Sequence, residues 1–130
     1  MVMMRRPRTA TTWWAGQRSA VAAAVAEAEA ATGHQIVVVV RRLGQSPAAS
    51  ADRIARRYRG ATVVVCVDPV GRTFEIRWHG QWAAPAGVVD ELSRMLADGR
   101  LADAVALVGR VIPRGDGRGR DLPDIVDEES

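Results

Sequence analysis

Two runs of β-branched residues constrain the fold of this chain more than any other feature. Residues 36–40 read Ile-Val-Val-Val-Val and residues 61–67 read Ala-Thr-Val-Val-Val-Cys-Val, without alternation between apolar and polar side chains. A strand that is apolar on both faces needs cover on both faces, as the strands of parallel sheets have. The sequence therefore predicts two buried strands, over residues 35–41 and 61–67, between two layers of helices.

The segment between these runs is typical of a helix that crosses over a sheet. Ser46 and Pro47 suit the N-cap and the first position of a helix, and Gly60 suits its end. Apolar side chains recur at helical spacing from Ala51 to Tyr58. A strand, a helix and a strand within about thirty residues indicate a right-handed βαβ unit with parallel strands.

The next segment alternates between apolar and polar residues, which predicts a strand with one buried face. Residues 68–71 read as a turn, so we expect Cys66 to lie opposite Thr73. The strand over Thr73 to His79 should return antiparallel at the edge of the sheet. Helical periodicity predicts three further helices, over residues 18–32, 88–97 and 101–112. The predicted fold class is α/β, a three-layer α/β/α sandwich on a small mixed sheet, with a βαβ unit and an antiparallel edge hairpin strand.

The length and composition fit one folded domain. Of the 130 residues, 48% are apolar and 25% are charged, which favours a packed core over disorder. We expect a flexible basic segment over 1–16, the domain over 17–113, and a flexible tail over 114–130 that is Gly- and Arg-rich and then acidic. No apolar run approaches the roughly 20 residues that cross a bilayer, and residues 1–18 lack a secretory apolar region. A cytoplasmic protein is expected, with a membrane-proximal place through a partner as the alternative.

Missing residue types exclude several kinds of chemistry. The chain has no lysine and no asparagine, which excludes a lysine Schiff base, a lysine-bearing phosphate loop and an N-glycosylation site. Its one cysteine, Cys66, excludes an internal disulfide and a multi-cysteine metal site. The net charge of +3 comes with eighteen arginines, of which four lie within residues 1–18 and four follow residue 109. Nucleic-acid binding is not favoured, because no basic face interleaved with aromatic residues is visible.

Several segments, in a fixed order, resemble a known family. The segments are residues 29–39 (EAATGHQIVVV), 60–69 (GATVVVCVDP), 72–76 (RTFEI) with Gly80, and 96–105 (LADGRLADAV). In their order and spacing they resemble the TPM domain family, and especially the actinobacterial domains of unknown function related to it. The resemblance spans about residues 18–112, which is most of the chain. It implies an α/β sandwich; many TPM domains lie beside membranes, and some plant members are described as calcium-binding acid phosphatases. Calcium is the cofactor that the resemblance implies.

Polar residues follow the two buried strands at the point where each strand ends. Ligands of open α/β sheets collect beyond the carboxyl ends of the parallel strands, and the start of the following helix attracts anions there. The candidate ligand-binding residues at this edge are Arg41, Arg42, Ser46, Asp68 and Arg72. They predict an anion or phosphate site, with solvated arginines and a turn-forming Asp68 as the alternative.

Cys66 and Arg72 are spaced as in a cysteine phosphatase loop. That chemistry requires a helix after the arginine, to lower the pKa of the thiol, whereas Thr73 to His79 reads as a strand. The two histidines, His34 and His79, are expected at the opposite edge of the sheet from Asp68. Neither catalytic residues nor metal ligands can be assigned from these patterns.

We therefore expect a non-catalytic binding or assembly module. Its protein partner would be met through Trp13 and Trp14 or through the edge strand Thr73 to His79. The alternative is a phosphatase-like hydrolase, calcium-dependent in that case, with its anion site at the carboxyl edge of the strands.

Overall fold

Four helices and four strands make up the computed structural model, which describes residues 5–79, 85–113, 115 and 123–128, with side chains from Trp14 onward. In chain order the elements are α1 (Arg5–Thr32), β1 (Ile36–Val40), α2 (Pro47–Arg57), β2 (Val63–Asp68), β3 (Thr73–Trp78), α3 (Ala86–Ala97), α4 (Leu101–Val111) and β4 (Ile125–Asp127). The sheet has the order β3-β2-β1-β4. β1 runs parallel to β2 and to β4, and β3 runs antiparallel to β2.

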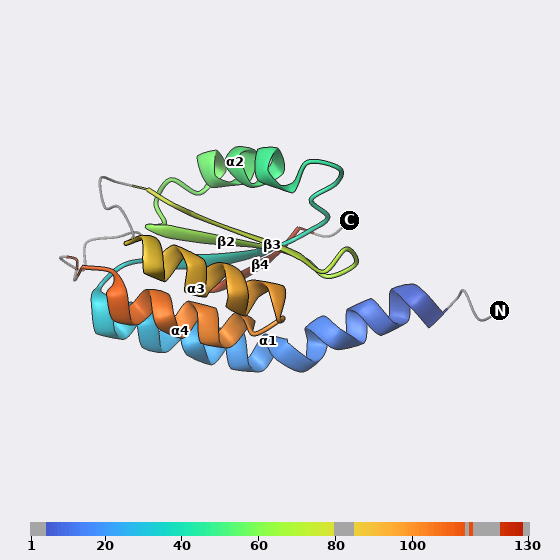
Figure 1. Ribbon diagram of the computed structural model, residues 1–130, viewed down its shortest axis with the longest axis horizontal. Helices are drawn as coiled ribbons and strands as arrows, with labels where there is room; N and C mark the ends of the chain where they lie inside the picture. The colour runs from blue at the N-terminus through green and yellow to red at the C-terminus, as the bar shows by residue number, and fades with distance from the viewer. Residues whose placement is uncertain (1–4, 80–84, 114, 116–122, 129–130) are drawn as a thin grey trace.

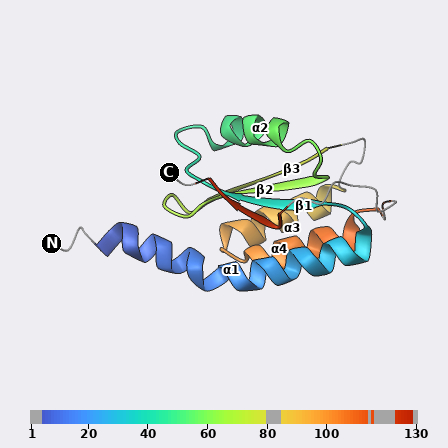
Figure 2. The same ribbon diagram turned by 180° about the vertical axis from the view of Figure 1, so that it is seen from behind.

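The sheet lies between two helical layers. Helix α2 covers one face, and α1, α3 and α4 cover the other (Figure 1; Figure 2 shows the same layers from behind). The predicted three-layer α/β sandwich on a small mixed sheet is therefore confirmed. No helix in the described part of the chain is both long enough and apolar enough to cross a membrane.

Successive residues of the valine-rich strands enter two separate cores. Val38 and Val65 belong to the larger core, beneath α1, α3 and α4, whereas Val39 and Cys66 belong to the smaller core beneath α2. This division follows from the period of two in a strand. It explains why β1 and β2 lack polar residues until Asp68, since both of their faces are covered.

The first helix begins at Arg5, so the prediction of a flexible segment over 1–16 was wrong from Arg5 onward. Trp14 is buried within the larger core and anchors the helix ahead of the predicted start at residue 18. Pro7 lies in the first turn, where its missing amide hydrogen costs no intrahelical hydrogen bond. Trp14 is thus a core residue and no partner contact; the side chain of Trp13 lies outside the described ones.

The tail and the hairpin also differ from prediction. Residues 114–130 were expected to be flexible, but Ile125–Asp127 form β4, a strand too short for its periodicity to be recognised. In the hairpin, Cys66 pairs with Glu75, and Asp68 pairs with Thr73. The connection between β2 and β3 is therefore longer than the predicted turn, and it ends at Arg72 in the left-handed conformation, with φ of 52°.

Candidate functional site

Asp68, at the end of β2, is a structural acceptor of hydrogen bonds. Its Oδ1 accepts from the backbone N–H groups of Val70 (3.0 Å) and Gly71 (2.9 Å). Its Oδ2 accepts from the N–H of Leu43 (3.0 Å), in the loop after β1. The carboxylate thus joins two loops at the carboxyl edge of the sheet, and both of its oxygens are engaged in that role.

The other four predicted ligands lie in three different parts of the fold. Arg41 turns toward the C-terminal segment, where its Nη1 lies 3.4 Å from Glu128 Oε1. Arg42 is exposed in the loop after β1, and Ser46 is exposed at the start of α2 without a side-chain capping bond. Arg72 lines a groove beside β3. The anion site at this edge therefore remains a prediction.

Cys66 lies inside the sheet and is fully buried. Burial raises the pKa of its thiol to about 12, whereas a nucleophilic cysteine needs a lowered pKa. The residues after Arg72 form β3, so the spacing of Cys66 and Arg72 does not produce a phosphate-binding loop.

Both histidines form hydrogen bonds that connect different segments of the fold. His34 Nε2 lies 2.6 Å from the carbonyl oxygen of Pro113, and Nδ1 lies 2.8 Å from Oγ1 of Thr62. Because a carbonyl oxygen only accepts, Nε2 must donate. His79 Nε2 lies 2.9 Å from the carbonyl oxygen of Ala55. In the described part of the chain, no three His, Cys, Asp or Glu side chains are grouped so that they could hold a metal ion.

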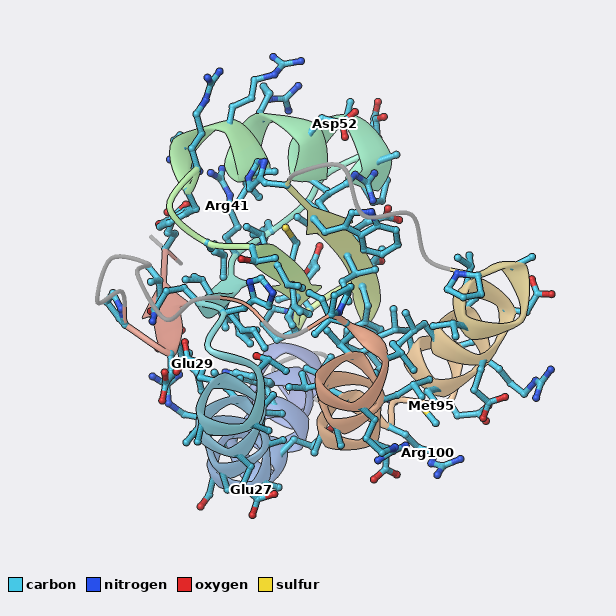
Figure 3. The ribbon with its side chains drawn as sticks, turned by 90° about the vertical axis from the view of Figure 1, so that its left-hand side faces the viewer. Glu27, Glu29, Arg41, Asp52, Met95 and Arg100 are labelled. Carbon is cyan, nitrogen blue, oxygen red and sulfur yellow. The ribbon has the colours of Figure 1, made fainter. Side chains whose placement is uncertain are left out.

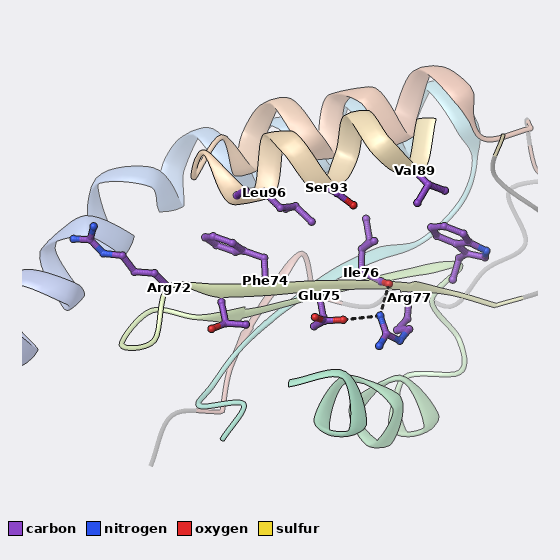
Figure 4. Close-up of a pocket in the computed structure, with 11 residues that line it drawn as sticks. Arg72, Phe74, Glu75, Ile76, Arg77, Val89, Ser93 and Leu96 are labelled. Carbon is purple, nitrogen blue, oxygen red and sulfur yellow. Dashed lines mark hydrogen bonds and ion pairs between the residues drawn. The ribbon is translucent and has the colours of Figure 1, made fainter. Parts of the chain in front are cut away.

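A groove of about 460 Å³ runs between β3 and α3. Phe74 and Ile76 of β3 point toward α3, from which Val89, Ser93 and Leu96 approach them (Figure 4). The groove follows the outer edge of the sheet, because β3 is the last strand in the order β3-β2-β1-β4. It therefore combines an edge strand, an apolar wall and a helix.

The opposite face of β3 is closed by ion pairs. Arg77 lies 3.0 Å from Glu75 and donates a hydrogen bond of 2.8 Å to Asp52 of α2. Burial lowers the pKa of Arg77, but hydrogen bonds to Asp52 and Glu75 outweigh burial and raise it. These contacts engage the charged side chains of Glu75 and Arg77 on the α2 side of β3, whereas Phe74 and Ile76 face α3.

A second cluster joins the C-terminal segment to α2, and sequence reasoning missed it. Arg57 Nη2 donates to Glu128 Oε1 at 2.7 Å, and the hydroxyl of Tyr58 donates to Glu128 Oε2. Burial raises the pKa of Glu128, but the bonds from Tyr58 and Arg57 and the charge of Arg41 outweigh burial and lower it. The only signal in the sequence was the acidic end of a chain whose α2 is rich in arginine.

Comparison with known proteins identifies a similar fold. No family model matches the chain, and no curated protein matches it. Among solved structures, the chain is similar to the NMR structure of BA42 protein from the psychrophilic bacterium Bizionia argentinensis sp. nov.. The TM-score is 0.65 at 17% identity, over 87% of this chain and 93% of that chain. At this identity the similarity shows a shared α/β fold.

Proposed function

We propose that this chain is a non-catalytic binding module that takes an extended peptide of a protein partner along β3. The groove between β3 and α3 is the observation that carries the proposal. A peptide that adds a strand to a sheet gains main-chain hydrogen bonds, while pockets for alternate side chains supply specificity. An edge strand beside a helix provides both.

The backbone of β3 is oriented for such an addition. The N–H of His79 donates to the carbonyl oxygen of Thr62, so odd-numbered residues of this strand turn their backbone groups toward β2. The even-numbered residues, Ile76 among them, therefore turn theirs toward the outer edge, where a peptide would replace the hydrogen bond of 2.9 Å that Arg77 Nη1 donates to the carbonyl oxygen of Ile76. Their side chains line the same groove, so a peptide at this edge would meet apolar side chains at every second position.

The walls of the groove indicate which peptide fits. Ser93 and Ala97 of α3 are small and leave room for apolar side chains of the ligand. Arg72 stands at the start of β3, at one end of the groove (Figure 4). The preferred ligand is an extended segment with apolar residues at alternate positions.

We also propose that the chain is related to TPM domains and that it acts in the cytoplasm. Its partner would be what brings it close to a membrane. A phosphatase-like hydrolase is the weaker candidate, because the chemistry of Cys66 does not support it: its thiol is buried and protonated at neutral pH. Calcium binding remains an expectation that follows from the resemblance alone.

Selection from a phage-displayed library of random ten-residue peptides tests the proposal. Selected peptides should show the alternating apolar pattern, and their binding should weaken about tenfold or more on Ser93→Trp, because the indole fills the groove. The matched control is Ser19→Trp, at an exposed serine of α1, which should leave binding unchanged. Peptides that bind Ser93→Trp as tightly as the unaltered chain, or a selection that yields no peptide, would contradict the proposal.

A further inference from the structure

The outer edge of β1, opposite to β3 in the sheet, is covered by a short strand from the end of the chain. We propose that this edge, together with Arg41, Arg57 and Tyr58, is a binding site for an acidic extended segment of a protein partner, which the chain's own residues 124–128 occupy in its absence. The site differs from the groove beside β3 in position and in ligand, so it extends the proposed function.

The backbone of β1 requires a strand at this edge. The N–H of Val38 donates to the carbonyl oxygen of Asp124 (2.9 Å), and the carbonyl oxygen of Val40 accepts from the N–H of Glu128 (2.8 Å). Upstream, the N–H of Ile36 donates to Glu29 Oε2 (3.0 Å). Because buried backbone groups without partners are costly, this edge has to be paired by a strand from this chain or from another.

The side chains at the end of β1 select an acidic residue. Glu128 receives hydrogen bonds from Arg57 (2.7 Å), Arg41 (3.4 Å) and Tyr58. Its side chain is 18% exposed, so these contacts are partly shielded from water. Hydrogen bonds with an ionised partner are among the stronger ones in proteins. Arg41 lies beneath α2 (Figure 3).

The resident strand is short, so a longer segment of a partner can displace it. Among the described residues, Ile125–Asp127 pair with β1, and Asp124 and Glu128 each add one backbone hydrogen bond. The ion pair between Arg18 and Asp127 is exposed at 43% and 51%, where such pairs contribute little. The strand belongs to the same chain as β1, so a partner has to bind more tightly than the tail does at its local effective concentration.

A segment of a partner can make contacts beyond those of the resident strand. A hollow of about 230 Å³ beside the Glu128 contacts is lined by Arg41, Ser50, Arg53, Ile54 and Arg57. Arg53 adds a further cation there, and its Nη2 donates to the hydroxyl of Ser50 (3.1 Å). A segment with two β-branched residues followed by two or more acidic residues therefore fits the site best.

Binding of a synthetic peptide to the full chain tests this inference. The probe is a fluorophore-labelled peptide of residues 123–130, and fluorescence anisotropy reports its binding. Glu128→Gln should bind the probe about tenfold more tightly than the unaltered chain, because its own tail leaves the site more often. A probe with glutamine at the position of Glu128 should bind about tenfold more weakly.

A second pair of variants distinguishes binding of the probe at this site from nonspecific attraction of the acidic probe to arginine side chains. In the Glu128→Gln chain, Arg57→Gln should abolish probe binding, whereas Arg56→Gln removes the same charge from an exposed neighbour and should leave binding unchanged. Equal loss in both variants, or equal affinity of Glu128→Gln and the unaltered chain, would overturn the inference. A concentration-dependent dimer of the unaltered chain that the probe dissociates would overturn it in favour of a second copy.

Hydrogen exchange locates the bound probe. The N–H of Arg41 donates to the carbonyl oxygen of Val67, so Val37 and Val39 turn their amides toward β2, whereas the Val38 amide faces β4. In Glu128→Gln, exchange at Val38 should accelerate and should slow again on addition of the probe, with Val39 unchanged. Exchange at Val38 that does not respond to the probe would overturn the inference.

Discussion

Tyr58 is the only tyrosine of the chain, so a titration of its phenol reports on a single position. Burial raises its pKa to about 12, and the hydrogen bond to Glu128 and the negative charge of Glu128 act in the same direction. Because the pKa in the folded chain lies above the ordinary value of 10.0, this tyrosine contributes stability that is complete below about pH 10. That contribution is lost as the pH rises toward the folded pKa.

We therefore expect the Tyr58 phenol of the unaltered chain to ionise near pH 12 and that of Glu128→Gln to ionise at lower pH. The substitution removes the negative charge beside the hydroxyl, which eases formation of the phenolate. Ultraviolet absorbance of the phenolate measures the midpoint, and circular dichroism verifies that each chain remains folded. Identical midpoints in the two chains would show that Glu128 does not contact Tyr58 in solution.

Asp68 shows why the type of a residue alone does not predict its role in the structure. A carboxylate after a buried strand suits either a ligand site or a turn. Only the folded structure shows that three backbone N–H groups donate to Asp68. Glu128 shows the converse case. Its contact with Arg41 spans 87 positions of the chain, and no pattern of local spacing can reveal such a pair.

Among the elements, α1 and α4 approach each other unusually closely. A Cβ atom at Gly109 of α4 would lie 2.7 Å from the Cβ and 3.1 Å from the Cα of Ala28 in α1. The absence of a side chain at Gly109 therefore sets the distance between the two helices. The alanine-rich stripe of α1 allows a close approach from the other side.

Gly109→Ala should lower the free energy of unfolding by about 1–3 kcal/mol, because the added methyl group forces two packed helices apart. The control is Gly16→Ala within α1, where no described atom lies within 4 Å of the new Cβ. There the better helix propensity of alanine should raise the free energy of unfolding by about 0.5–1 kcal/mol. Urea denaturation measures both, and a stabilising Gly109→Ala would show that the helices are not so closely packed.

A helix or strand could be predicted when its sequence pattern spans enough residues to be recognised. Strands β1 and β2 were recognised because Ile36–Val40 and the run before Asp68 lack polar residues, and β3 because it alternates. Strand β4 has only Ile125–Asp127, too few residues for a period to show. The start of α1 was missed because Trp13 and Trp14 were placed outside the domain, and the burial of Trp14 shows only in the folded core.

In the molecule as a whole, the two edges of the sheet differ in what lies beside them. The β3 end lies beside a groove lined by α3, and the β1 end is covered by residues of the chain's own tail. The order of the strands could be anticipated as far as β2 and β3, because a βαβ unit and a hairpin follow from local connections. The two candidate binding sites could not, because each depends on side chains that meet only in the folded molecule.

The position of Cys66 in the centre of this sheet has a practical consequence. Its side chain is fully buried, and it is the only thiol of the chain. A maleimide reagent should therefore react only when the centre of the sheet opens, and the rate should rise steeply as denaturant is added. Mass spectrometry of the alkylated chain would follow this rate, and immediate labelling in native buffer would contradict the buried position. The single thiol thus reports how often the centre of the folded sheet opens.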